Sequence, residues 1–259
     1  MHVADALWLV PAGFAAGAVN AIAGGGSLIT FPTLIALGFP PITANVTNSV
    51  AVTPGYLGSV AGSRADLAEL AATHRLLPLG PTAMAGGAAG CLLLLTTPAR
   101  AFDLIAPFLV LGAAALIAVQ PRLRAMVARR SDTGTGRRRS GVAVHAVVAV
   151  LAAYGGYFGA ALGVMLLATL GLVLAASLRH INALKNAISA VVALVTVAVF
   201  GVFGPVDWVA VAIVAPTTSV GGFLGARWAT RLSQRVLRAF IVAVGAAAGL
   251  ALLGRALAA

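Results

Sequence analysis

Three consecutive glycines, Gly24, Gly25 and Gly26, interrupt an apolar stretch near the start of the chain. Glycine loses the most backbone entropy on ordering, so three in a row are expected to end the helix that precedes them. At membrane depth a break leaves N–H and C=O groups unpaired, which is tolerated only beside protein or a water-filled cavity. Residues 6–22 and 27–37 are therefore predicted to form the two arms of a re-entrant helical hairpin.

The composition agrees with a membrane environment. Of the 259 residues, 61% are hydrophobic and 9% are charged, and the mean hydropathy is +1.03. A chain this apolar has no room for a separate soluble domain, so a multi-pass membrane protein is predicted. The net charge of +11 would suggest nucleic acid as the partner of a soluble protein. Here the arginines lie between apolar runs, which indicates loops at the membrane surface and no nucleic acid.

Residues that could support catalysis are scattered. The four histidines are far apart in the sequence, and Cys91, the only cysteine, has no histidine near it. No enzyme activity, cofactor or metal is therefore expected, and a disulfide within the chain is excluded. Residues 1–5 contain no Lys or Arg, so the basic region that opens a signal peptide is not expected either.

An arginine-rich stretch, residues 121–141, lies near the middle of the chain. Its composition predicts a flexible cytoplasmic linker between a first transmembrane repeat, residues 1–120, and a second, residues 142–259. Residues 64–75 are expected to be an exposed connection. The remaining apolar segments are 43–63, 76–96 and 101–120 in the first half, and in the second half 142–160 and 163–176 around a glycine-rich break, followed by 181–203, 207–227 and 236–254.

An internal duplication is visible in the letters. Residues 81–90 and 216–225 share a Pro-Thr pair followed by Gly-Gly and a further Gly, at an offset of 135 residues. For the paired glycines of these stretches, close helix packing is the expected role. At an offset of 138, Gly25 aligns with Gly163 and Asn48 with Asn186.

The distribution of positive charge selects the kind of repeat. If each glycine break is a re-entrant hairpin, each half crosses three times, and every Lys and Arg except Arg100 and Arg255 lies on the linker's side. Four crossings per half would spread them almost evenly over both sides, so the positive-inside rule favours three. The predicted fold is an all-α integral membrane protein of about eight hydrophobic segments in two inverted repeats, each a broken hairpin plus three spanning helices.

Several of these motifs resemble the TauE/SafE family, also called the 4-toluene sulfonate uptake permease (TSUP) family, over roughly residues 8–254. They are the stretch from Gly17 to Gly38, the span start at residues 44–49, the pair Lys185-Asn186, and residues 221–225. The resemblance implies a multi-pass carrier in the cell membrane for small sulfur-containing or organic anions such as sulfite or sulfoacetate.

An anionic substrate needs hydrogen-bond donors and positive potential. All six acidic residues fall at predicted helix ends or loops, so none is expected beside the substrate. The first candidates are at the start of the second hairpin arm, where free N–H groups and the helix dipole attract anions. These candidates are Gly24, Gly25, Gly26 and Ser27, with Thr30 one turn further on. The second break, near residues 159–163, could contribute only backbone groups.

Three further candidates are polar residues near the starts of later spans. Asn48 and Asn186 could donate their amides to a sulfonate oxygen, or could hydrogen-bond a neighbouring helix. Lys185, the only lysine, could bind the anion or extend to the lipid headgroups. Together these residues predict a secondary transporter that works by alternating access. A passive anion channel and a carrier of carboxylates remain as alternatives, and a proton could move with the anion or on His145.

Overall fold

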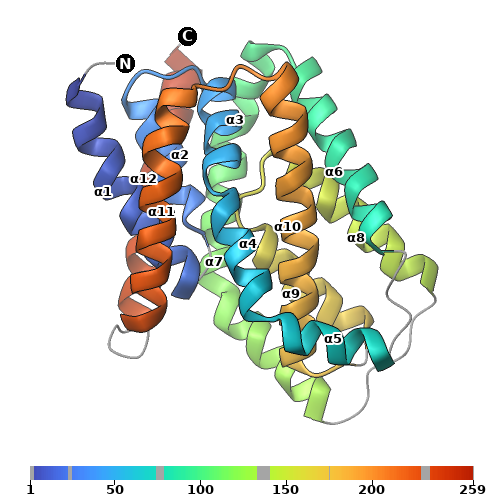
Figure 1. Ribbon diagram of the computed structural model, residues 1–259. Coiled ribbons are helices and arrows are strands. Elements are labelled where there is room, and N and C mark those ends of the chain that lie inside the picture. Colours follow the sequence, from blue (N-terminus) through green and yellow to red (C-terminus); the bar gives the residue numbers. More distant parts are fainter. Residues whose placement is uncertain are drawn as a thin grey trace.

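The computed structural model describes residues 3–22, 25–73, 79–132, 141–174, 176–228 and 234–258. Within these ranges the chain is all α-helical, as the sequence predicts, with twelve helices and no strand (Figure 1). The helices are α1 (Val3–Ile22), α2 (Ser27–Ala36), α3 (Pro41–Ala51), α4 (Thr53–Gly62), α5 (Arg64–Thr73), α6 (Leu79–Thr96), α7 (Ala99–Asp132), α8 (Gly141–Tyr157), α9 (Leu162–Val173), α10 (Leu178–Phe203), α11 (Trp208–Trp228) and α12 (Gln234–Ala258).

Both predicted helix breaks are present. The first lies between α1 and α2, where Gly25 has φ +102°, a value that favours glycine. The second lies between α8 and α9, where Gly159 has φ +75° and Ala161 has φ +59°. At 10 residues, α2 is only about 15 Å long, half of a hydrocarbon core of about 30 Å. Gly24 lies outside the described residues.

Four helices in the described part of the chain are long and apolar enough to cross a membrane. They fall within α6, α7, α10 and α12, where single spans are predicted. The expected single span over residues 43–63 is wrong, because the chain forms α3 and α4 with Val52 between them. Pro54, in the first turn of α4, lacks the N–H that would continue the helical hydrogen bonds of α3.

Two stretches expected to connect the spans are helical. Residues 64–73 form α5, whose Asp66 lies in its first turn, where a negative charge favours a helix. The prediction of a flexible linker over residues 121–141 is wrong for its first part, because α7 continues to Asp132. Pro121 does not end this helix, so Gln120 and Arg124 lie one turn apart on it.

Glycines let two pairs of helices approach closely, α1 with α11 and α6 with α8. A Cβ added to Gly221 would lie 2.1 Å from the carbonyl oxygen of Phe14, and one added to Gly86 would lie 2.5 Å from that of Ala149. Gly86 and Gly221 are 135 residues apart, and so are Phe14 and Ala149. The packing role expected for these glycines is confirmed, and the equivalent contacts support the internal duplication.

The direction of the chain in Figure 1 agrees with halves of opposite orientation. The N- and C-terminal ends both lie at the top, whereas α7 ends and α10 begins at the bottom. Several helix contacts have an equivalent under exchange of the halves, with α1 corresponding to α8, α2 to α9 and α7 to α12. Thus α1 packs on α2 as α8 packs on α9, and α2 packs on α12 as α9 packs on α7. The two breaks consequently face a common interior.

Candidate functional site

A cavity of about 740 Å³ lies between the two helix breaks. Gly25 and Ser27 line it from the first break, and Gly159 and residues 161–164 line it from the second. Polar and charged side chains from α1, α4, α7 and α10 complete its wall. They are Asn20, Tyr56, Ser59, Gln120, Arg124, Arg179, Asn182, Lys185, Asn186 and Ser189.

Two of the residues that line the cavity are exposed, Ser59 near the end of α4 and Arg179 near the start of α10. These two helix ends lie towards the bottom of Figure 1. Towards the other end the breaks are covered by Phe31 and Phe158, whose rings meet edge to face at a centroid distance of 5.4 Å. Contacts of α3 add to this cover: Asn45 Nδ2 donates to the carbonyl of Tyr157 over 2.9 Å, and the N–H of Asp207 donates to Thr47 Oγ1 over 3.0 Å.

At the first break, a side chain is bound to some of the backbone N–H groups that were predicted to bind the anion. Asn20 Oδ1 accepts the N–H of Gly25 over 3.2 Å and the N–H of Gly26 over 3.4 Å. Gly26 is buried, and a Cβ there would lie 2.3 Å from the carbonyl oxygen of Ala16. Ser27 remains on the cavity wall, at the first turn of α2. The Asn20 amide therefore stands between these glycine N–H groups and the cavity.

At the second break, the backbone does not act alone as expected. A Cβ added to Gly163, in the first turn of α9, would lie 3.8 Å from Lys185 Nζ. Lys185 thus lies on the cavity wall beside the N-terminus of α9, and its role in binding stays a prediction. Tyr154 holds the other side of the break, because its hydroxyl donates to the carbonyl of Ala160 over 2.7 Å.

The polar candidates Thr30, Asn48 and Asn186 all bridge helices. The Thr30 hydroxyl, on α2, donates to Asn48 Oδ1 on α3, and both side chains are buried. Asn48 also lines a smaller cavity next to the main one. Asn186 Nδ2, on α10, donates to the carbonyl of Ser59 on α4 over 3.3 Å and to Ser63 Oγ, just after α4, over 3.2 Å, and its side chain lies on the main cavity wall. The helix-bridging alternative therefore holds for both asparagines, and a role in binding stays a prediction.

Sequence reasoning missed two arginines of the wall, Arg124 and Arg179. The sequence predicts Arg124 to lie in the flexible linker. Its spacing of four residues from Gln120 is the missed signal, because in a longer α7 this spacing places both side chains on one face, and both line the cavity. His145, the proposed proton carrier, is placed elsewhere: its Nδ1 is 2.7 Å from Thr82 Oγ1, between α8 and α6. It is not among the residues that line the cavity.

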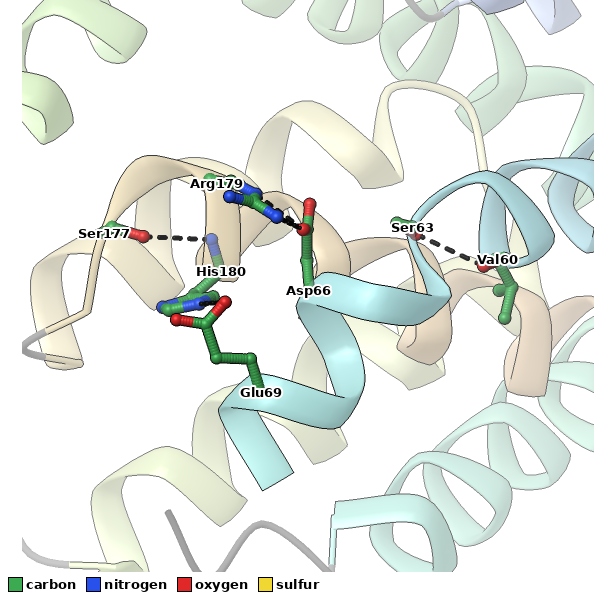
Figure 2. Close-up of polar contacts among 7 residues, drawn as sticks. All are labelled: Val60, Ser63, Asp66, Glu69, Ser177, Arg179 and His180. Atoms are coloured by element: carbon green, nitrogen blue, oxygen red, sulfur yellow. Dashed lines mark hydrogen bonds and ion pairs between the residues drawn. The ribbon is translucent and has the colours of Figure 1, made fainter. Parts of the chain in front are cut away.

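The end of the cavity near α5 is held by charge pairs (Figure 2). Arg179, on α10, forms an ion pair with Asp66 on α5, and His180 Nε2 lies 3.4 Å from Glu69 Oε2. The hydrogen bond from Arg179 lowers the pKa of Asp66 below its ordinary value. Ser177 caps the start of α10, since its hydroxyl oxygen accepts the N–H of His180 over 3.3 Å.

The charge of the cavity wall is positive. Arg124 and Lys185 lie on it, and the part of the chain that the structure describes contributes no carboxylate to it. Arg179 is already paired with Asp66. No group of three or more His, Cys, Asp or Glu side chains able to hold a metal is found among the described residues. The arrangement provides donors and positive potential, which are the requirements of an anion site.

A cationic cavity between two broken helices, in an apolar all-α chain, defines the class of multi-pass membrane transporter. The chain belongs to the sulfite exporter TauE/SafE family, whose model matches residues 9–252. It is similar to a probable membrane transporter protein, ORF9, from Sinorhizobium sp., at 28% identity over 95% of this chain and 91% of the relative.

Two other relatives carry similar names. The probable membrane transporter protein YfcA of Escherichia coli K12 is 30% identical over 89% of this chain and 83% of its own length. A probable membrane transporter protein of Haemophilus influenzae is 27% identical over 89% of this chain. No solved structure is significantly similar. The chain is a membrane transporter of this family and not an enzyme.

Proposed function

We propose that this transporter moves small anions, sulfite or organosulfonates, across the cell membrane. The observation that carries the proposal is the cavity between the two helix breaks, where Arg124 and Lys185 face a wall without a carboxylate from the described residues. An anion entering this space gains charge-assisted hydrogen bonds, whereas a cation is repelled. The family description supplies the sulfur chemistry.

The proposed mechanism is alternating access between two inverted repeats, residues 1–120 and 142–259. By the positive-inside rule, residues 121–141 and the open end of the cavity face the cytoplasm. The state described here then accepts an anion from the cytoplasm, while Phe31, Phe158 and the contacts of α3 close the outer path. In the second state these contacts would part and the end near Arg179 would close.

The moving bodies in this mechanism each contain helices from both halves. Gly221 lets α11 pack closely on α1, and Gly86 lets α6 pack closely on α8, so each pair is expected to move as one body. Rocking is therefore proposed between the α1–α11 pair and the α6–α8 pair. Proton movement, if coupled, would occur on the anion itself.

Ligand binding and exchange together test the proposal. Thermal stabilisation of the purified protein is measured with sulfite, sulfate, thiosulfate, sulfoacetate, taurine and acetate, because a ligand of the folded state raises its apparent stability. Reconstituted vesicles then report counterflow. A carrier exchanges anion faster when the same anion is present on the far side, and a passive channel does not. Stabilisation by acetate alone, or flux without counterflow, would contradict the proposal.

A variant ties this measurement to the cavity. Asn20→Asp keeps an oxygen that accepts the N–H groups of Gly25 and Gly26 but adds a negative charge to the cavity wall. We expect at least about tenfold weaker anion binding, because a like charge within the cavity opposes the ligand at close range. Ala65→Asp adds the same charge at an exposed site on α5 and serves as the control. Equal anion affinity in both variants would place the binding site elsewhere.

A further inference from the structure

Two cationic side chains on the cavity wall lack a negative partner. Neither Arg124, on α7, nor Lys185, on α10, forms an ion pair with a carboxylate among the residues that the structure describes. Arg124 Nε is buried and has no hydrogen-bond partner, and the same holds for Ser189 Oγ on the same wall. Buried donors without partners are costly, so these groups lack an acceptor, and the cavity that both side chains line has space for a ligand that could supply one.

The number of uncompensated charges defines the ligand more closely. Arg179 lies on the same wall, but Asp66 neutralises it. The other polar side chains of the wall are amides and hydroxyls, which carry no charge. Arg124 and Lys185 therefore leave the wall with two positive charges. A ligand with one negative charge would leave one cation uncompensated in a membrane interior, which is unfavourable.

We infer that the preferred ligand is an oxyanion with two negative charges, bound between Arg124 and Lys185 with the Ser189 hydroxyl as a further donor. This inference rests on the proposed function and names its substrate class. Arg124 can offer two parallel N–H groups to two oxygens, and Lys185 a compact charge beside the N-terminus of α9. Among sulfur anions, the doubly charged form of sulfite and sulfonates that carry a carboxylate fit, while taurine and simple alkyl sulfonates lack the second charge.

Sulfate and methanesulfonate test the inference, because both are tetrahedral at sulfur and differ by one charge. Their dissociation constants are obtained from concentration-dependent thermal stabilisation of the detergent-purified protein. We expect the wild type to bind sulfate at least about tenfold more tightly than methanesulfonate. Arg124→Gln and Lys185→Met should each remove most of this preference by weakening sulfate binding more than methanesulfonate binding. Arg124→Lys, which keeps the charge, should retain most of it.

Arg122→Gln is the matched control, since Arg122 is exposed on the same helix and does not line the cavity. It should leave the preference for sulfate unchanged. The thermal midpoint without ligand shows whether each variant is folded. If both anions bind equally to the wild type, or the preference survives in Arg124→Gln and Lys185→Met, the inference is overturned while the proposed function stands. If no anion in either panel stabilises the protein, both are overturned.

Discussion

At the scale of single residues, a side-chain amide is hydrogen-bonded to the backbone N–H groups that the sequence assigns to the substrate. Asn20 accepts the N–H groups of Gly25 and Gly26, so these groups already have a partner in this structure, and a role in binding stays a prediction. The helix break at the glycine run was predictable, because the effect of glycine on a helix is local. The hydrogen bonds of Asn20 could not be predicted, because they depend on the path of the chain between α1 and α2. Lys185 was recognised as a candidate, but only the fold shows that it faces the cavity.

The hydrogen bond between Thr30 and Asn48 gives a prediction at this scale. Thr30→Val keeps the volume but removes the donor, leaving Asn48 Oδ1 buried without it. We expect a loss of about 1–3 kcal/mol in stability, the cost of an unsatisfied buried polar group. Thr33→Val is the control, because Thr33 is only half-buried and its hydroxyl bonds within its own helix, to the carbonyl of Ile29. Equal thermal midpoints for the two variants would show that the bridge between α2 and α3 contributes little.

At the scale of helices, the lengths of the elements decide which residues meet. Hydropathy predicted the apolar segments well, because membrane spans need long apolar runs. It placed the end of α7 too early, since arginines and Pro121 are typical of a loop, and so it assigned Arg124 to the linker. It also joined α3 and α4 into one span, because both are apolar and Pro54 alone is weak evidence for a boundary.

Neighbouring glycines on one helix allow a sharp test of helix packing. On α11, a Cβ at Gly221 would lie 2.1 Å from the Phe14 carbonyl oxygen, whereas one at Gly222 would lie 3.7 Å from its nearest atom, the carbonyl oxygen of Gly17. Gly221→Ala should destabilise the protein by roughly 1–3 kcal/mol, because two backbones must separate. Gly222→Ala should be neutral or slightly stabilising, since alanine favours a helix. Thermal unfolding of both variants checks this, and equal effects would refute the close contact.

At the scale of the whole molecule, the proposed mechanism makes this structure one of the two states of a carrier. The cavity reaches the surface near Ser59 and Arg179, and the aromatic contact of Phe31 with Phe158 lies towards the other side. Positive charge in the sequence predicts that the linker's side is cytoplasmic, and this stays a prediction. The pairing of α1 with α11 and of α6 with α8 could not be predicted, since it joins helices far apart in the chain.

Chemical labelling tests this sidedness. In a Cys91→Ala background, Ser59→Cys should react with a membrane-impermeant thiol reagent added from the cytoplasmic side, and a bound anion should slow the reaction. Ala99→Cys is the control: it is exposed at the start of α7, at the end of that helix remote from the linker, and should react only from outside, with no effect of anion. Labelling of both positions from the same side would contradict the placement of these two helix ends on opposite sides of the membrane.

The glycine contacts also bear on how such a chain could arise. Each close helix pair takes one member from each half, so a single half contains no partner for its own glycines. If the two halves are inverted, as proposed, one half alone could form these pairs only with a second copy lying antiparallel to it in the membrane. An antiparallel homodimer, later fused through the segment that joins α7 to α8, is then the simplest precursor of this fold.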